Sequence, residues 1–359
     1  MAHHVHWLSN RHPRPAHLVV AGDDLRADRA LTLVRRGRAV LWRGDYRNAR
    51  QLLAAMRRRL DRRPVPPGDT PAETFHRHRA VTADRARLLN RLVLELGPGY
   101  RIDLPHAPDV SLACRQAYGP DPGPALVPLA ELLGVLGAHQ WRARGVLVPA
   151  LDATIHPHYG VFAPTRQDYV QLVADAPWPG ATTAFDVGTG TGVLAALLAR
   201  RGAGRVVATD IEPRAVACAR DNTRRLGLTG RIEVRLADLF PAGRADLVVC
   251  NPPWLPATPA APLDAAVYDP ESRVLRRFLH EVSARLTPGG EAWLVLSDLA
   301  ERLGLRRRGE LTGMFADARL TVVDRLDTRP RPRRRADSLS VYRAAEITSL
   351  WRLSAASSV

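Results

Sequence analysis

The sequence contains no lysine, so arginine supplies all 52 of its lysine-plus-arginine positions. Against 36 acidic residues this gives a formal net charge of +16. A complete preference for arginine is typical of the codon usage of a GC-rich genome, which explains the choice of residue but not the excess of positive charge. That excess predicts an anionic partner, RNA or the ribosome, because a positive field attracts polyphosphates. A merely solvated basic surface is the alternative.

Cysteine is also scarce, with three residues at positions 114, 218 and 250 and no CxxC pair. This spacing excludes a disulfide framework, and the histidines lack the spacing of a zinc or HExxH site, so we expect no metal. No apolar run approaches the ~18–20 residues that a membrane helix needs. The first six residues lack the cationic and apolar segments of a signal peptide. We therefore expect a cytoplasmic protein without a membrane partner.

The length of 359 residues favours two domains, and the pattern changes near residue 150. Residues 1–150 carry amphipathic, arginine-rich segments at 49–60 and 84–96 and an apolar run at 125–138, which together predict a mainly helical N-terminal domain. From residue 183, apolar strands alternate with helices, which predicts an α/β fold with a mostly parallel sheet over residues 151–359. Ligands of such sheets bind at the carboxyl ends of the strands.

A glycine-rich turn follows the first strand of this predicted sheet. Gly188, Gly190 and Gly192 let the chain turn tightly into a helix and let its backbone approach a ligand. Such a turn is equally typical of a dinucleotide site. Asp210 ends the second strand, where a carboxylate can accept both ribose hydroxyls, and Asp238 follows the third, where it can accept from an adenine amino group. An ordinary loop acid is the alternative at both positions.

The fourth predicted strand ends in Asn251, Pro252, Pro253 and Trp254. The lone pair of an amide or nucleobase amino nitrogen is delocalised, so the nitrogen must be held with that lone pair directed at the carbon it attacks. The Asn251 side-chain oxygen and the Pro252 carbonyl can accept its two N–H hydrogens. The prolines stiffen the loop, and Trp254 offers a flat face for stacking. A structural Asn-Pro-Pro turn is the alternative.

In this order, over roughly residues 155–300, the motifs resemble class I S-adenosylmethionine-dependent methyltransferases of the branch with an (N/D)PP(Y/F/W) motif. That branch includes release-factor and ribosomal-protein glutamine methyltransferases, and the ribosomal RNA and DNA amino-group methyltransferases of the small-domain type. The resemblance implies a Rossmann-like sheet with an antiparallel C-terminal strand and S-adenosyl-L-methionine as the cofactor. The implied cofactor contacts are Asp186, Gly188, Thr189, Gly190, Gly192, Asp210, Ile211, Asp238, Leu239 and Asn251.

Pro253 is one candidate contact to the acceptor, and two further segments supply others. Residues 159–166 resemble the segment that closes over the cofactor in the glutamine-methylating group, but the usual Pro-Arg-Pro-Glu-Thr is here Pro164-Thr165-Arg166. Thr165 and Arg166 are therefore candidate cofactor or acceptor contacts. Near the C-terminus, five arginines in seven residues, Arg333 and Arg334 among them, lie in a predicted hairpin connection and could bind several phosphates. A mobile solvated loop is the alternative.

Several functions remain open at this point. The leading hypothesis is an N-methyltransferase that acts on an exocyclic amino group in ribosomal RNA, with Asn251, Pro252 and Trp254 as catalytic residues and the base extruded into their pocket. A protein glutamine N5-methyltransferase would use the same acceptor geometry. A small-molecule methyltransferase is a further alternative, since fold does not fix substrate. The intact motifs argue against a catalytically silent RNA-binding factor. Residues 1–150 are the expected acceptor-recognition domain.

Overall fold

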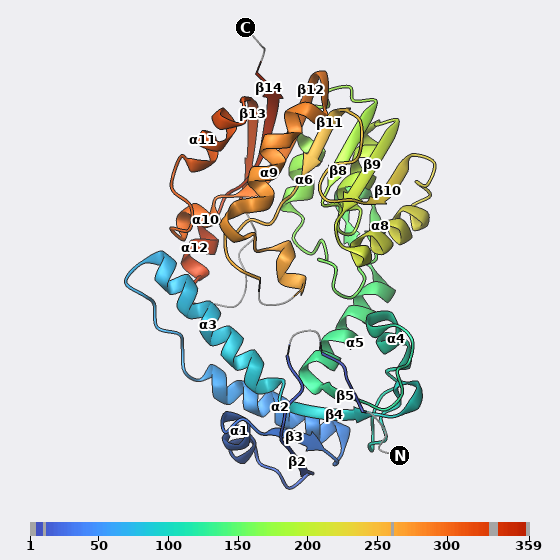
Figure 1. Cartoon of the computed structure of the whole chain (residues 1–359), viewed down its shortest axis with the longest axis vertical. Helices are drawn as coiled ribbons and strands as arrows, with labels where there is room; N and C mark the ends of the chain where they lie inside the picture. The colour runs from blue at the N-terminus through green and yellow to red at the C-terminus, as the bar shows by residue number, and fades with distance from the viewer. Residues whose placement is uncertain (1–4, 10–11, 260–261, 330–336, 357–359) are drawn as a thin grey trace. The chain divides into compact units, whose positions relative to one another are not determined.

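The computed structural model describes residues 5–9, 12–259, 262–329 and 337–356, and the chain divides into two compact units (Figure 1). The N-terminal unit comprises Met1–Asp69, Glu73–Trp141 and Ala260–Pro262. The C-terminal unit comprises Thr70–Ala72, Arg142–Pro259 and Leu263–Val359. The main division thus falls between residues 141 and 142, inside a helix.

The N-terminal unit is built on a five-stranded sheet with the order β1-β5-β4-β3-β2. Its strands are β1 His6–Trp7, β2 Leu18–Ala21, β3 Ala39–Trp42, β4 Leu92–Leu96 and β5 Ala125–Pro128, and its helices are α1 Ala27–Arg35, α2 Tyr46–Asp61, α3 Pro71–Leu89, α4 Ser111–Tyr118 and α5 Leu129–Arg144. Strand β4 pairs antiparallel with β5, and the other pairs are parallel. One core joins the helices to the sheet, with Trp42, Met56 and Leu94 at its centre.

Helices hold most of the regular residues of this unit, as predicted, but the sheet was not predicted. The segments 84–96 and 125–138 were each expected to be a single helix, and both expectations are wrong in part. The first contains the end of α3 followed by β4, and the second begins with β5 before α5 starts. Both strands are almost fully buried, so they show the continuous apolar run that periodicity alone does not distinguish from a buried helix.

The C-terminal unit contains a seven-stranded sheet with the order β10-β9-β8-β11-β12-β14-β13. Its strands are β8 Thr183–Val187, β9 Arg205–Asp210, β10 Ile232–Leu236, β11 Ala245–Cys250, β12 Leu286–Ser297, β13 Leu320–Thr328 and β14 Thr348–Ala355. The five from β10 to β12 are parallel, and β14 is antiparallel to both its neighbours. This is the doubly wound order with one antiparallel strand inserted, which confirms the predicted Rossmann-like fold.

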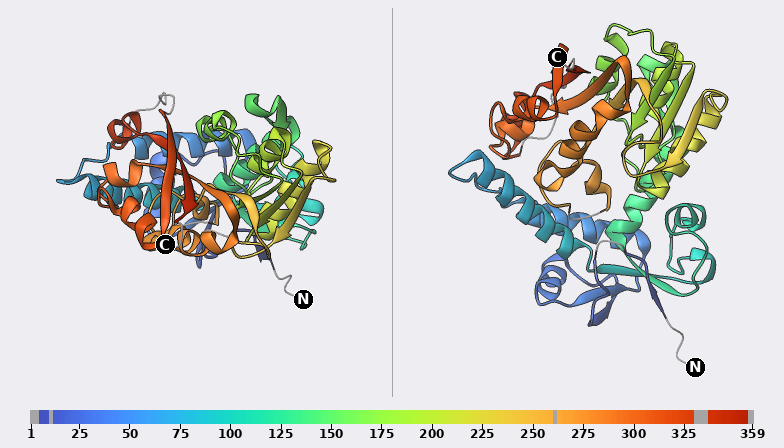
Figure 2. Two further views of the ribbon diagram at one scale, coloured as in Figure 1. Left: turned by 90° about the horizontal axis from the view of Figure 1, so that it is seen from above. Right: turned by 45° about the horizontal axis from the view of Figure 1, so that its top comes forward.

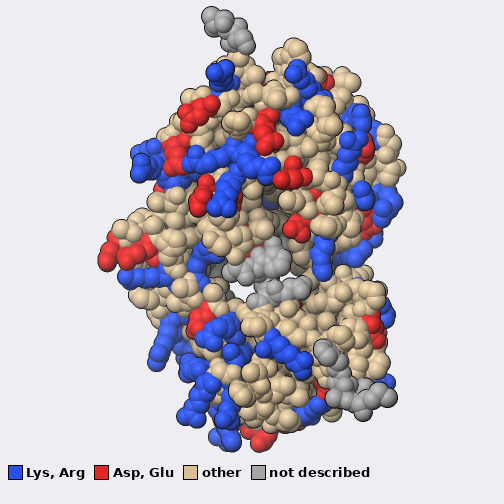
Figure 3. Space-filling model, viewed as in Figure 1, with Lys and Arg blue, Asp and Glu red and all other residues tan. Residues whose placement is uncertain are grey.

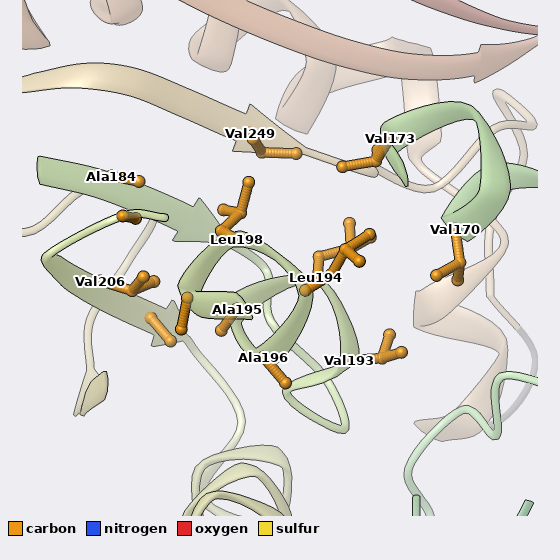
Figure 4. Close-up of a cluster of buried hydrophobic side chains, with 14 of the residues drawn as sticks. Val170, Val173, Ala184, Val193, Leu194, Ala195, Ala196, Leu198, Val206 and Val249 are labelled. Atoms are coloured by element: carbon orange, nitrogen blue, oxygen red, sulfur yellow. The ribbon is translucent and has the colours of Figure 1, made fainter. Parts of the chain in front are cut away.

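Alternate residues of these strands enter two different cores, as the pleat requires. On one face, Ala184, Val206 and Val249 pack against helices α6 Asp168–Asp175, α7 Val193–Arg201 and α8 Pro213–Arg225. Figure 4 shows apolar side chains of α7 lying against strands β8, β9 and β11 and beside α6. On the other face, Phe185 and Val248 pack against α9 Arg273–Val282 and α11 Glu310–Asp317. The two views of Figure 2 show the sheet of this unit between these helices.

The remaining elements are short. They are the hairpin β6 Val146–Val148 and β7 Ala153–Ile155, the helices α10 Leu299–Arg302 and α12 Ser340–Ala344, and 3₁₀ turns at Pro98–Tyr100, Pro149–Leu151, Pro262–Ala266, Pro270–Ser272 and Ser283–Arg285. Among the described residues, no helix combines the length and apolarity that crossing a bilayer requires. The same part of the chain holds no group of three histidine, cysteine or acidic side chains suited to a metal ion.

Candidate active site

The predicted site residues lie at the carboxyl ends of β8, β9, β10 and β11. The chain passes from β8 to β9 and β10 on one side, and then crosses to β11 on the other side of β8. The order of the strands therefore reverses at β8, and ligands of open α/β sheets bind in the crevice outside such a point.

The turn after β8 is built from three glycines with left-handed backbone, at φ of +73° for Gly188, +54° for Gly190 and +82° for Gly192. A Cβ atom on Gly188 or Gly190 would meet nothing within 4 Å, so both leave open space above the turn. Gly192 differs, because a Cβ there would lie 3.3 Å from Ala219 of α8. The first two glycines can thus admit a ligand, whereas the third allows α7 to start close to α8.

Two buried side chains support this turn from below. Asp186 is 1% exposed, and its Oδ2 accepts from the Thr189 hydroxyl at 2.6 Å and from the Ala195 N–H at 2.9 Å. Burial raises the pKa of Asp186 to about 6. Asp186 and Thr189 are two of the predicted cofactor contacts. They hydrogen-bond each other beneath the loop, where the pair fixes the shape of the turn.

Asn222 is a second support, and no role was predicted for it. Its Nδ2 donates to the Thr191 carbonyl at 3.0 Å, and its Oδ1 accepts from the His156 N–H at 2.8 Å. Asn222 is 1% exposed and follows Val216 and Ala219 on the buried stripe of α8. A polar residue at that spacing signals a buried group that needs partners, and this signal was available in the sequence.

Asp210 connects the turn to the end of β9. Its Oδ2 accepts from the Gly190 N–H and its Oδ1 from the Glu212 N–H, both at 2.9 Å. Burial raises the pKa of Asp210, although these backbone hydrogen bonds act in the opposite direction. Because a carboxylate offers about four acceptor positions, both oxygens can still accept hydroxyl hydrogens.

The loops after β9 and β10 present an apolar and an acidic side chain. Ile211 is 62% exposed and thus available for an apolar contact. Leu239 has a left-handed backbone at φ +66°, and its carbonyl accepts from the Thr209 hydroxyl, which fixes this loop to β9. Asp238 is exposed and paired with Arg277 of α9, whose Nη1 lies 3.1 Å from both carboxylate oxygens. An adenine amino group would therefore have to share this carboxylate with a guanidinium, which the sequence did not reveal.

At the end of β11, Asn251 and Trp254 bind each other. The Trp254 Nε1 donates to the Asn251 Oδ1 at 2.8 Å, and both side chains are partly exposed. This bond fixes which way the Asn251 amide faces, and a carbonyl oxygen keeps a second lone pair for another donor. Pro252 is buried and Pro253 is partly exposed, so this loop packs on one side only.

Arg166 covers the Trp254 ring, with its guanidinium carbon 4.7 Å from the ring centroid. The same guanidinium donates to Asp168 from Nε at 2.9 Å and from Nη2 at 2.8 Å, to Glu346 from Nη1 at 2.8 Å, and to Thr348 from Nη2 at 2.7 Å. Burial lowers the pKa of Arg166, but the two carboxylates outweigh it and the pKa is raised. Arg166, predicted as a cofactor or acceptor contact, is thus engaged within the protein and stacked on Trp254.

The segment that carries Arg166 runs along the site. The backbone of His156 hydrogen-bonds the Asn222 side chain, and Val161 packs with Ala215 and Cys218 of α8. At the other end of the segment, the Arg166 guanidinium stacks on the Trp254 ring. Thr165 on this segment is exposed. The segment therefore connects the glycine turn to the Asn251–Trp254 loop. The remaining candidate acceptor contacts, Arg333 and Arg334, lie outside the described residues, between β13 and β14.

The chain is similar to known methyltransferases. A family model described as the methyltransferase small domain matches residues 152–320. The release factor glutamine methyltransferase of Cereibacter sphaeroides is 35% identical over 163 residues, which cover 42% of this chain and 57% of that protein. A ribosomal protein L11 methyltransferase of Bordetella parapertussis is 36% identical over 245 residues, 62% of this chain and 75% of that protein.

A third relative is the ribosomal RNA small subunit methyltransferase C of Chromohalobacter salexigens. It is 33% identical over 190 residues, which cover 50% of this chain and 53% of that protein. The chain therefore spans little more than half the length of the release-factor and ribosomal-RNA relatives.

Proposed function

Because the chain belongs to the S-adenosylmethionine-dependent methyltransferases built on the methyltransferase small domain, we propose that it transfers a methyl group to a planar amino or amide nitrogen. The observation that carries this proposal is the 2.8 Å bond from Trp254 to Asn251. It holds an amide oxygen at the end of β11, the strand beside β8 and its open glycine turn.

The residues after β8 and β9 fit the cofactor. Gly188 and Gly190 leave room for a ligand close to the backbone, and the Asp210 oxygens have acceptor positions for two ribose hydroxyls. The exposed Ile211 can contact an adenine ring, and Asp238 can accept from its amino group despite the Arg277 pair. S-adenosylmethionine, when bound, supplies a methyl group activated by a positively charged sulfur.

The acceptor nitrogen needs orientation more than deprotonation. Asn251 Oδ1, fixed by Trp254, can accept one N–H of the acceptor, and the Pro252 carbonyl is proposed to accept the other. With both hydrogens held, the lone pair is the part of the nitrogen that remains to form the new bond. The surplus proton leaves to solvent afterwards, so no strong general base is required.

We propose a base in RNA as the acceptor. The net charge of +16 supports a polyanionic substrate, and one relative is named as a ribosomal RNA methyltransferase. A glutamine side chain of a ribosomal protein or release factor is the second candidate. The release-factor relative favours it, and a glutamine amide has the same planar nitrogen.

The acceptor class can be tested with methyl-labelled S-adenosylmethionine and lysate from a host strain that lacks the gene. Aliquots are treated with ribonuclease or with protease before the macromolecular label is measured. Loss of label with ribonuclease alone supports RNA, and loss with protease alone supports glutamine. No macromolecular label at all would contradict both acceptors.

Asn251 gives the matching test of the site. We expect Asn251→Ala to lower turnover by about 10² or more, the scale of removing one orienting hydrogen bond, while S-adenosylmethionine affinity measured by calorimetry stays within a few-fold. Asn251→Asp keeps an acceptor oxygen and should retain more activity than the alanine variant. Normal methylation by Asn251→Ala would refute the assignment of a nitrogen acceptor to this residue.

A further inference from the structure

An arginine-lined cavity of about 260 Å³ opens between α1 and α2 in the N-terminal unit. Its lining residues are Asp28, Leu31, Arg35, Arg59, Leu60, Arg62 and Arg63. A water molecule occupies about 30 Å³ of liquid, so this volume is large enough for a tetrahedral oxyanion with several waters. The cavity lies outside residues 152–320, which match the family model, and outside the motifs of the candidate active site.

The charges around this cavity are not balanced. Arg59 is paired with Asp28, from Nε to Oδ1 at 2.6 Å and from Nη2 to Oδ2 at 3.1 Å. This hydrogen bond lowers the pKa of Asp28, so the carboxylate stays charged and neutralises one guanidinium. Among the described residues, Arg35, Arg62 and Arg63 form no ion pair with a carboxylate, and Asp28, whose pKa the nearby Arg62 also lowers, is the one acidic residue that lines the cavity beside four arginines.

Structural roles account for only part of this cluster. Arg35 and Arg59 lie in the last turns of α1 and α2, where a cation interacts favourably with the helix dipole. Arg62 is the C-cap residue of α2 and Arg63 follows it, so the end of this helix carries four cations, Arg58, Arg59, Arg62 and Arg63, of which Asp28 hydrogen-bonds one. An anion bound among these guanidinium groups would reduce their mutual repulsion.

The cavity combines this charge with an apolar floor. Leu31 is 3% exposed and Leu60 is partly buried, whereas Arg35, Arg62 and Arg63 are exposed, so an anion bound here would contact apolar side chains on one side and guanidinium groups on the other. Guanidinium groups also match phosphate oxygens in pairs of parallel hydrogen bonds, which an isolated surface charge does not provide.

We propose that this cavity is a phosphate-binding site that holds a backbone phosphate of the RNA acceptor. The proposal rests on the proposed function in that the acceptor is RNA. Figure 3 shows that blue arginine side chains gather over the region of α1, α2 and α3. The exposed Arg36, just after α1, and Arg57 and Arg58 on α2 extend the positive surface beyond the cavity, so neighbouring phosphates of the same strand can be bound as well.

The test compares two charge-matched triple variants of the full chain. The cavity variant is Arg35→Ala/Arg62→Ala/Arg63→Ala, and the control is Arg47→Ala/Arg50→Ala/Arg115→Ala, three exposed side chains of α2 and α4 that do not line the cavity. The probe is a fluorescent single-stranded oligouridine, and its Kd is measured over a series of KCl concentrations. We expect the cavity variant to bind the probe tenfold or more weakly, and its salt slope to fall by about 0.7 for each phosphate that it no longer neutralises. The control should change both quantities less.

Equal losses in the two variants, or none in either, would overturn the proposal, because binding would then follow net charge alone. A parallel titration with inorganic phosphate identifies the source of the anion. If inorganic phosphate raises the Tm of the wild type but the cavity variant binds oligouridine normally, the cavity holds free phosphate and the RNA assignment is wrong.

Two further measurements separate folding and function from phosphate binding. S-adenosylmethionine affinity and Tm are measured for each variant, and Arg62→Gln/Arg63→Gln, which lies outside both helices, replaces the triple variant if that one does not fold. Failure of the proposed function appears as absence of RNA label in the wild type. Failure of the cavity proposal appears as equal RNA affinity of the two triple variants, whichever acceptor is labelled.

Discussion

Arg166 links Trp254 to α6 and β14 of the C-terminal unit. Its guanidinium bonds Asp168 at the start of α6 and Thr348 at the start of β14, and also Glu346, whose side chain is only 3% exposed. A planar group with five donors can satisfy these acceptors and stack on an indole at the same time. We interpret Arg166 as a positioning residue, which acts on the acceptor through Trp254 and Asn251.

This role predicts a specific effect of Arg166→Lys. A lysine ammonium keeps the charge beside Asp168 and Glu346, so we expect the variant to fold, but it cannot form the planar fork or stack flat on the indole. Turnover should fall by about tenfold or more because Trp254 no longer fixes Asn251, an effect within the range known for small displacements in a site. S-adenosylmethionine affinity, measured by calorimetry, should change by less than a few-fold.

A matched control exists in the same unit. Arg325 stacks on Trp351 with its guanidinium carbon 4.5 Å from the ring centroid, and it pairs with Asp327 on β13 rather than with a site residue. Arg325→Lys should therefore leave turnover unchanged. If the two lysine variants had the same turnover, stacking at Trp254 would have no particular role in catalysis.

Single residues also mark where prediction from sequence ended. The glycine turn, Asp210 and the Asn251–Trp254 loop could be placed because each follows an apolar strand at a fixed offset. The partners of Arg166 and Asp238 could not, since Glu346 lies 180 positions from Arg166, and Arg277 lies 39 from Asp238. Such contacts depend on how strands and helices from distant parts of the chain pack, and local patterns do not contain that information.

At the scale of elements, the link between β8 and α7 depends on a buried carboxylate. Asp186 is the fourth residue of β8, and its Oδ2 accepts from the backbone of α7 at Ala195. Burial raises its pKa from 3.8 to about 6, so between these values the folded chain holds a proton that the unfolded chain has released. The contribution of this group to stability is therefore full below pH 4 and is lost as the pH rises through 6.

The substitution Asp186→Asn tests this. One amide oxygen can accept from both Thr189 and Ala195, and the buried charge is removed. The free energy of unfolding of the variant, relative to wild type, should rise between about pH 4 and pH 7 by roughly 3 kcal/mol, since about two pKa units correspond to 1.36 kcal/mol each. Urea unfolding at both pH values measures it, and a pH-independent difference would refute the prediction.

Asp246 provides a control with the opposite sign. Hydrogen bonds from the Thr183 and Thr182 N–H groups and the Thr287 hydroxyl lower its pKa, so its contribution is present above the unfolded pKa and lost as the pH falls. Relative to wild type, Asp246→Asn should become less stable as the pH rises. The two variants together separate the effect of Asp186 from a general effect of acid.

Prediction of elements succeeded where strands and helices alternate and failed where they meet without a turn signal. In the C-terminal unit, Gly, Pro and Asp residues separate the elements, and the four predicted strands that precede the site residues, β8 to β11, are confirmed. In the N-terminal unit, Asn90 and Arg91 are the two residues between α3 and β4, and β5 passes directly into α5. Leucines at helical spacing on both sides of Asn90 and Arg91 hid the first junction, and a continuous apolar run hid the second.

At the scale of the whole molecule, the two units have separate hydrophobic cores. The core around Met56 and Leu94 contains only residues of the N-terminal unit, and the two cores on either side of the seven-stranded sheet contain only residues of the C-terminal unit. The proposed cofactor contacts all lie in the C-terminal unit. Ligand binding and core mutation should therefore act on different units.

Calorimetric unfolding of the full chain tests this division. We expect two unfolding transitions. S-adenosylmethionine should stabilise only one of them, and at a concentration a hundredfold above its Kd it should raise the free energy of unfolding of that unit by about 2.7 kcal/mol. Met56→Ala truncates a side chain that is 0% exposed in the N-terminal core. It should therefore lower the free energy of unfolding of the N-terminal unit by the roughly 2–5 kcal/mol usual for such a change, and so lower the temperature of the other transition. Opposite shifts of two separate transitions would assign cofactor binding to the C-terminal unit alone. A single transition, or a ligand shift of the transition that Met56→Ala lowers, would mean that the units unfold together.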